Sequence, residues 1–169
     1  AGVVSIVSDT WDFWRVITEY ARELKPQILA RQPNAIGLAK VVFRPDSGDP
    51  VRILAGYRWA EVADRAAAAQ AQVDGAEAVR IDGRYFILEG SGEALTLKPA
   101  REAEIKGAVE CLWDIFGGTE TAQGYRVLHE RVGLIYGDSI TLVRAEAILS
   151  ALAAKGFASC NVVFGIGSF

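Results

Sequence analysis

The sequence predicts an α/β fold of about four parallel strand–helix units, with a helix and a small antiparallel β-meander inserted into the second unit. Four short apolar runs recur along the 169 residues, and the first three are followed by apolar side chains at helical spacing. Strands separated by helices pair in parallel through right-handed crossovers. The inserted part instead alternates polar and apolar residues around glycine turns, as antiparallel hairpins do.

The first unit begins with the apolar run at residues 3–7. The apolar residues of its helix are Phe13, Ile17, Tyr20, Leu24 and Ile28. We expect Thr10 to cap the N-terminus of this helix, because a hydroxyl can accept hydrogen bonds from its first free N–H groups. We expect Pro26 to kink or end the helix near Lys25, because proline lacks the N–H donor and clashes with the preceding turn.

The other three apolar runs are residues 40–43, 132–136 and 162–164. The helix of the second unit carries apolar residues from Ile105 to Phe116, and Gly117 and Gly118 should stop it. The helix of the third unit carries them from 142 to 152, with Gly156 as its stop. These units assign residues 1–50 and 100–169 to a β/α barrel portion.

Residues 51–99 form the expected insertion. Its first part, residues 60–73, is rich in alanine and should be helical. Its second part has β-prone residues on either side of Asp82-Gly83, the strongest short hairpin signal, and a second turn at Gly90-Ser91-Gly92. It carries no ligand signature of its own, so we expect a structural or interfacial role.

The composition excludes several classes of protein. The chain is 51% hydrophobic and 23% charged, which suits a packed core and argues against disorder. Its net charge of −3, without a basic stripe, argues against a nucleic-acid partner. Cys111 and Cys160 lie far apart and, with one His, predict no metal site; we expect two buried, reduced thiols in a cytoplasmic protein. No apolar run is long enough to cross a membrane. Met is absent even at position 1, so we expect a piece of a longer protein.

Polar groups recur where the apolar runs end. They are Ser8-Asp9, the block at 44–50, Gly137-Asp138-Ser139 and Gly165-Ile166-Gly167-Ser168. The C-terminal strand ends of a β/α barrel share the face that carries active sites, so these four stretches should converge. Carboxylates suit ribose hydroxyls, and glycines let backbone N–H groups approach a phosphate.

Each group also has a simpler interpretation. Asp9 and Asp138 could cap the helices that follow them, and Asp46 could be a turn residue. Arg44 could pair with Asp46 or Asp49 and do nothing else. The glycines could be turn formers, because a lone Gly-x-Gly is common by chance. We favour a ribose–phosphate site because carboxylates and glycines occupy equivalent places in successive units.

Four stretches resemble consecutive motifs of the nicotinamide phosphoribosyltransferase family. They are Val-Ser-Ile-Val-Ser-Asp-Thr-Trp-Asp at 4–12, Arg-Pro-Asp-Ser-Gly-Asp-Pro at 44–50, Leu-Ile-Tyr-Gly-Asp at 134–138 and Val-Phe-Gly-Ile-Gly-Ser-Phe at 163–169. The resemblance implies part of a type II phosphoribosyltransferase β/α barrel. It also implies synthesis of nicotinamide mononucleotide and pyrophosphate from nicotinamide and phosphoribosyl pyrophosphate, with Mg²⁺, in a cytoplasmic homodimer. Relatives that use nicotinate usually have Leu where this chain has Pro45, which favours nicotinamide.

The resemblance also implies roles for individual residues. Asp46 would hold ribose hydroxyls, and Arg44 would lie against nicotinamide and ribose. Asp9 would support the family's catalytic histidine, and Ser5 would lie near the amide end of the base. The phosphate-side residues would be Gly137, Asp138, Gly167 and Ser168, although animal members usually have Gly where Ser168 stands.

The resemblance leaves other groups unmatched. The family's catalytic histidine, its stacking aromatic and most of its pyrophosphate-binding basic residues have no counterpart in these 169 residues. His129 matches no family motif, and we expect an ordinary loop or surface residue. Three alternatives stay open: a nicotinate phosphoribosyltransferase fragment, a non-catalytic phosphoribosyl-binding module, and a purely structural subunit of a split enzyme.

Overall fold

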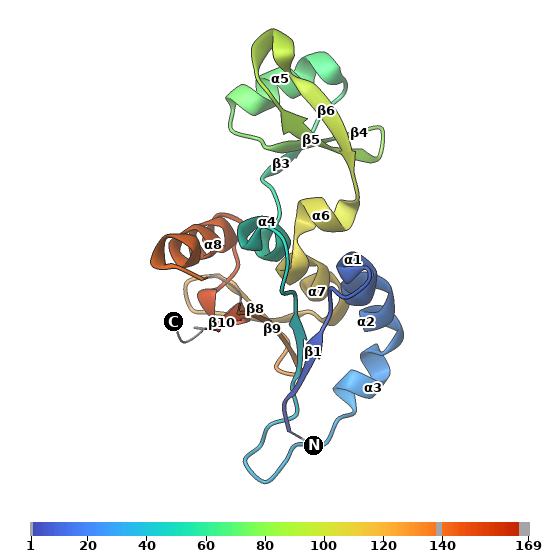
Figure 1. The fold of residues 1–169 in the computed structure, drawn as a ribbon, viewed down its shortest axis with the longest axis vertical. Helices are drawn as coiled ribbons and strands as arrows, with labels where there is room; N and C mark the ends of the chain where they lie inside the picture. Colours follow the sequence, from blue (N-terminus) through green and yellow to red (C-terminus); the bar gives the residue numbers. More distant parts are fainter. Residues whose placement is uncertain (1, 138–139, 166–169) are drawn as a thin grey trace.

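The computed structural model describes residues 2–137 and 140–165. Its main sheet has the order β1-β2-β9-β10, and every neighbouring pair is parallel. The strands are β1 (Val4–Val7), β2 (Val41–Arg44), β9 (Val132–Tyr136) and β10 (Val162–Phe164). Each strand coincides with one of the four apolar runs to within one residue, so the predicted parallel α/β architecture is confirmed (Figure 1). Closure into a barrel is not confirmed.

The first helical stretch is interrupted as the proline predicts. It comprises α1 (Phe13–Arg15), a π-helical turn (Val16–Tyr20), α2 (Ala21–Glu23) and α3 (Lys25–Leu29). The break falls at Leu24, immediately before the α3 turn that contains Pro26. The expected cap at Thr10 is wrong: the Asp12 carboxylate accepts the Arg15 N–H at 3.3 Å. A carboxylate at this position also complements the positive end of the helix dipole.

The single helix expected in the second unit is two helices, α6 (Glu102–Lys106) and α7 (Ala108–Phe116). They separate at Gly107, whose φ of +78° does not fit a right-handed helix. Apolar spacing runs through the break, because both helices turn an apolar side toward the same core. Gly117 ends α7 as predicted, again with a positive φ.

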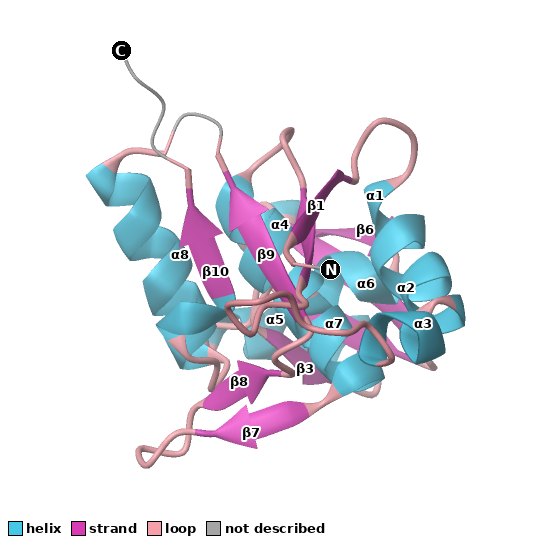
Figure 2. Ribbon diagram, turned by 90° about the horizontal axis from the view of Figure 1, so that it is seen from below, coloured by secondary structure: helices cyan, strands magenta, loops and turns pink. Residues whose placement is uncertain are grey.

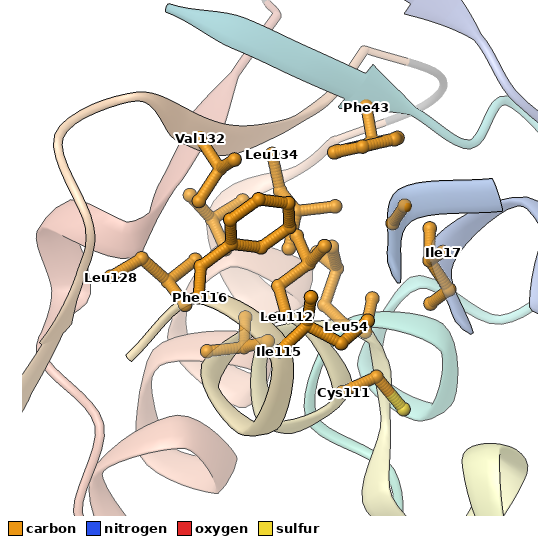
Figure 3. Close-up of a cluster of buried hydrophobic side chains, with 14 of the residues drawn as sticks. Ile17, Phe43, Leu54, Cys111, Leu112, Ile115, Phe116, Leu128, Val132 and Leu134 are labelled. Carbon is orange, nitrogen blue, oxygen red and sulfur yellow. The ribbon is translucent and has the colours of Figure 1, made fainter. Parts of the chain in front are cut away.

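The main core lies on one face of the sheet, under α4 (Pro50–Ala55), α7 and α8 (Leu142–Ala154). Figure 3 shows Leu54, Leu112 and Phe116 packed beneath strand residues Phe43 and Leu134. In Figure 2, β9 and β10 lie in front of α4, on the side that faces the reader. None of the described helices is long and apolar enough to span a membrane. Cys111 is buried as expected, but Cys160 is exposed.

Two further differences concern the main body. The expected insertion boundary at residue 51 falls inside α4, and the buried Leu54 and Ala55 belong to the main core. A hairpin of β7 (Gly118–Glu120) and β8 (Arg126–Leu128) was not expected, because its strands are too short for an alternating pattern. His129 follows β8, and its Nδ1 accepts the Arg131 N–H at 3.1 Å.

The inserted segment folds around its own small core of Ala68, Ala71, Val79, Leu88 and Leu95. Its sheet has the order β3-β4-β5-β6, with β3 (Trp59–Glu61), β4 (Ala78–Ile81), β5 (Arg84–Glu89) and β6 (Thr96–Ala100). A short 3₁₀ turn (Gly92–Ala94) precedes β6. The antiparallel meander and its Asp82-Gly83 hairpin are confirmed, with positive φ at both turn residues.

The expected helix at 60–73 begins later. Residues 59–61 form β3, which pairs in parallel with β4. The helix α5 (Arg65–Val73) begins at Arg65, and Asp64 caps it, because the Asp64 carboxylate accepts the Ala67 N–H at 2.8 Å. The alanine-rich composition hid this strand, since alanine favours helices and only pairing with β4 makes 59–61 extended.

Two glycines form the junction between the insertion and the main body. Gly56 and Gly107 cross in direct contact, and a Cβ added to Gly107 would lie 2.4 Å from the Gly56 nitrogen. Ion pairs flank the crossing on both connecting segments: Arg52 with Glu77 at 2.8 Å, and Arg101 with Asp12 at 2.8 Å. The insertion projects beyond α4 and α6, on the side of the helices away from the main sheet (Figure 1).

We predict that Gly107→Ala lowers the free energy of unfolding by about 2 kcal/mol more than Gly124→Ala, the scale of overpacking. Both glycines have a positive φ, +78° and +82°, but a Cβ on Gly124 meets nothing within 4 Å. The control therefore carries the conformational cost without the clash. Urea unfolding of both variants measures the difference, and equal losses would contradict the close approach at the junction.

Candidate functional site

The parallel register brings the strand ends to one edge of the main sheet. Val7 pairs with Arg44, and Phe164 pairs with Tyr136, so the segments that follow all four strands leave on the same side. Among the expected site residues, Asp9, Arg44, Asp46 and Gly137 lie at this edge. Asp138, Gly167 and Ser168 lie outside the described residues.

Asp9 joins the end of β1 to the turn that follows β2. Its Oδ2 accepts the Asp46 N–H at 2.8 Å and the Ser47 hydroxyl at 2.6 Å. Asp12, and not Asp9, caps the following helix, so the capping alternative for Asp9 does not hold. The turn at 45–48 therefore depends on a carboxylate contributed by the neighbouring strand.

Ser8 was expected at this edge as part of Ser8-Asp9, but the sequence assigned it no role of its own. It is 3% exposed; its hydroxyl donates to the Ile6 carbonyl at 2.7 Å and accepts the Arg44 N–H at 3.3 Å. The Ser8 N–H donates to the Arg44 carbonyl at 3.0 Å. These bonds extend the β1–β2 pairing to the point where the turn at 45–48 begins.

The charge state of Asp9 follows from its surroundings. Partial burial opposes ionisation, but the hydrogen bonds from the Ser47 hydroxyl and the Asp46 N–H outweigh it and hold the pKa of Asp9 below its ordinary value. Asp9 is therefore an ionised acceptor at neutral pH. A charged acceptor makes the stronger hydrogen bonds, which suits a residue that fixes a turn.

Arg44 and Asp46 form an ion pair where β2 ends at this edge of the sheet. The Arg44 Nε and a terminal nitrogen lie 3.1 and 2.9 Å from Asp46 Oδ2. The two side chains are 39% and 37% exposed, so the pair is open to a ligand. The expected pairing of Arg44 with Asp46 is thus confirmed. An exposed ion pair contributes little to stability, so a ligand could replace this contact at a small cost in free energy.

The turn after β2 ends in a tightly constrained segment. Gly48 has a φ of +89°, and a Cβ there would lie 2.7 Å from Ile53 Cδ1. The Asp49 carboxylate accepts the Val51 N–H at 3.0 Å and caps α4, with Pro50 in its first turn. The block at 44–50 therefore fixes a turn and starts a helix in seven residues.

The loops after β9 and β10 approach each other closely. The Gly165 N–H donates to the Tyr136 carbonyl at 2.9 Å, and a Cβ on Gly165 would lie 2.8 Å from the Gly137 Cα. Glycine at 165 thus permits two main chains to meet at this edge. Because the Gly165 N–H is used in this contact, the contact fixes the separation of the two loops.

Ser5 lies apart from the group formed by Asp9, Arg44 and Asp46. It pairs with Val42 in the middle of the strands, on the sheet face that carries Arg44. The helix-covered face carries the alternate residues, including Val41 and Phe43. The sheet face opposite the helices, which we call the open face, also receives the Lys40 side chain. Gly133 pairs with Val42 of this face, and a Cβ on Gly133 would lie 3.3 Å from Lys40 Cδ.

A cavity of about 410 Å³ adjoins the edge, lined by Asp9, Trp11, Ser47, Gly48, Arg101 and Glu104 among others. Trp11 is 94% exposed beside it. A larger cavity of about 620 Å³ lies away from the strand ends, between the first helical stretch and α6–α7. Among the described residues, no group of three His, Cys, Asp or Glu side chains is arranged to hold a metal ion. The edge therefore offers a partly exposed carboxylate that can accept hydrogen bonds from sugar hydroxyls, and a cation beside it, for a phosphorylated sugar.

We predict that Asp9→Asn lowers the free energy of unfolding by about 1 kcal/mol at pH 7, the scale of a partly exposed hydrogen-bonded charge. The folded pKa of Asp9 lies below its ordinary value of 3.8, so its contribution is complete above that pH. It is lost as the pH falls through the folded pKa. Urea unfolding at pH 7, 5 and 3 measures the free energy of unfolding of both proteins. The difference between wild type and variant should be the same at pH 7 and pH 5 and smaller at pH 3. A difference that vanishes near pH 6 would contradict the lowered pKa.

Comparison with known proteins gives matches over nearly the whole chain. The model of the nicotinate phosphoribosyltransferase (NAPRTase) family matches residues 3–169. A nicotinamide phosphoribosyltransferase of Acinetobacter baylyi (strain ATCC 33305 / BD413 / ADP1) is 56% identical over 169 residues, which is all of this chain and 26% of that protein. A nicotinamide phosphoribosyltransferase of Mycoplasma pneumoniae (strain ATCC 29342 / M129 / Subtype 1) is 30% identical over 98% of this chain and 27% of its own length.

A more distant match has the same name: a nicotinamide phosphoribosyltransferase of Xanthomonas campestris pv. campestris (strain 8004) is 27% identical over 98% of this chain and 23% of its own length. The chain thus spans about a quarter of the length of the curated relatives it matches. The matched regions include all four strand ends at the edge described above. The chain therefore belongs to the nicotinate phosphoribosyltransferase family.

Proposed function

We propose that this chain supplies the ribose- and phosphate-holding part of a nicotinamide phosphoribosyltransferase, an enzyme of NAD salvage. The whole enzyme would join nicotinamide to phosphoribosyl pyrophosphate and release nicotinamide mononucleotide and pyrophosphate. One observation carries the proposal: Asp9, the Arg44–Asp46 pair and the touching Gly137 and Gly165 share one sheet edge. The 56% identity to a nicotinamide phosphoribosyltransferase supports the same assignment.

The proposed chemistry needs positioning more than a reactive side chain. The bond between the ribose carbon and pyrophosphate breaks, and a bond to the ring nitrogen of nicotinamide forms, through an oxocarbenium-like state. Asp46, close to Arg44 and half exposed, would hold ribose hydroxyls. Asp9 would act indirectly by fixing the turn that carries Asp46. The Gly137 and Gly165 segments, with Asp138, Gly167 and Ser168, would hold the 5′-phosphate side.

Nicotinamide is the base that we propose. Two considerations favour it: three relatives are named nicotinamide phosphoribosyltransferases, and Pro45 stands where nicotinate-using relatives usually have Leu. Nicotinate is the second candidate, because the family model carries that name. Ser5, on the sheet face that carries Arg44, would lie near the amide end of the base, as the resemblance to the family implies.

We also propose that the main sheet is part of a closed barrel. Val4, Ile6 and Val7 of β1 are 38%, 40% and 46% exposed, which is unusual for apolar residues of a parallel strand. At the other edge, Val163 of β10 is 59% exposed. The remaining length of a full-size relative would cover these strands. We propose that the full-length enzyme is a homodimer in the cytoplasm.

Mg²⁺ would act in the whole enzyme by neutralising the pyrophosphate. The described residues do not fit a metal site, because Asp9 already accepts two hydrogen bonds and Asp46 is paired with Arg44. None of the described residues is therefore assigned to the ion.

We predict that Asp46→Ala in the full-length enzyme lowers kcat/KM by about 10- to 150-fold, the equivalent of a hydrogen bond from a charged group, about 1.5–3 kcal/mol. Stability should change little, because the pair is half exposed. The matched control is Asp64→Ala, which removes the cap of α5 in the insertion and should lower stability but not kcat/KM. Unchanged kcat/KM in Asp46→Ala would rule out a ribose contact.

We predict that these 169 residues alone have no transferase turnover but bind nicotinamide mononucleotide weakly, on the order of millimolar. The sugar-side groups are present, whereas the family's histidine, stacking aromatic and pyrophosphate-binding cations are unmatched. Calorimetry measures the affinity, and a coupled assay measures turnover. Turnover by these residues alone would show that an essential group was missed. Binding that survives Asp46→Ala combined with Asp138→Ala would show that the ribose is misplaced.

A further inference from the structure

We infer that Tyr136 is a positioning residue for Asp46, acting through the turn at 45–48. The Tyr136 hydroxyl donates a hydrogen bond to the Gly48 carbonyl at 3.0 Å, across the boundary between β9 and the segment after β2. Tyr136 is 2% exposed, so its ring is fixed by the main core. This inference rests on the proposed function, in which Asp46 holds the ribose.

The turn is held at three consecutive residues from two directions. Asp9 accepts hydrogen bonds from Asp46 and Ser47, and Tyr136 holds Gly48. The first contact comes from the segment that follows β1 and the second from β9, and these two strands flank β2 in the sheet. The position of the Asp46 side chain relative to the sheet therefore depends on both neighbours of β2.

Tyr136 also connects this turn with the predicted phosphate side. Its carbonyl accepts the Gly165 N–H at 2.9 Å, and the next residue, Gly137, lies against Gly165. One residue thus contacts the segments that follow β2 and β10. A substrate that spans the ribose and phosphate groups would need these segments at a fixed separation.

The Tyr136 hydroxyl should affect the position of the turn at 45–48 more than the stability of the fold. The ring supplies the buried apolar volume, and phenylalanine would keep it. Gly48 belongs to an exposed segment, so water can satisfy its carbonyl once the hydroxyl is gone. Tyr136→Phe should therefore leave the fold intact and free the turn to move.

The test is steady-state kinetics of the full-length enzyme with Tyr136→Phe. We expect kcat/KM for phosphoribosyl pyrophosphate to fall about three- to tenfold, the scale of one neutral hydrogen bond, with the KM for nicotinamide unchanged. Ile148→Val, a conservative change at a fully buried position of α8, is the stability control, and Tyr20→Phe removes a hydroxyl from the first helical stretch. Neither control should change kcat/KM.

A double-mutant cycle with Asp46→Ala then separates the possible outcomes. If Tyr136 acts through Asp46, Tyr136→Phe costs much less when Asp46 is already alanine. Additive losses, or a Tyr136→Phe variant that behaves like Ile148→Val, would overturn the inference while the effect of Asp46→Ala still supports the proposed function. If Asp46→Ala itself has no effect, the ribose contact and the role of Tyr136 both fail.

Discussion

Parallel pairing of β1, β2, β9 and β10 is the constraint on which the rest of this structure depends. Because all four strands run the same way, every segment that follows a strand emerges at one edge. Asp9 and Asp46, 37 residues apart in the sequence, are thereby brought into hydrogen-bond contact, and Gly137 follows the next strand at the same edge. The same pairing turns Val41, Phe43, Val132 and Leu134 toward the helices, so one register fixes both the core and the candidate site.

The insertion is joined to this framework without disturbing it. Gly56 and Gly107 let the outgoing and returning segments cross in contact, and the Arg101–Asp12 ion pair ties the returning segment to the start of α1. Asp12 lies three residues after Asp9, so this ion pair joins the returning segment to the chain close to the candidate site, while the insertion itself projects away from the main sheet (Figure 1). Its separate small core shows that the meander and α5 pack mainly on each other.

Interactions between strand ends, rather than single residues, define the candidate site. Asp9 and Asp46 were recognised from the recurrence of carboxylates after apolar runs, and the structure connects them by a hydrogen bond. Ser8 was expected at the strand ends without a role, and Tyr136 was not expected to contribute a side-chain contact. A serine at a strand end and a tyrosine in an apolar strand usually indicate pairing and core packing, and their partners belong to other strands. Only the folded arrangement identifies those partners.

The sequence by itself determined the features that depend on local preference. Apolar runs placed the four strands, Asp82-Gly83 placed a hairpin through its left-handed backbone, and Pro26 placed the helix break. Tertiary structure alone decided where α6 and α7 separate and that residues 59–61 form a strand. It also placed α4 in the main core and Tyr136 under the ribose turn. These features depend on contacts between segments far apart in the chain, and local spacing carries no information about such partners.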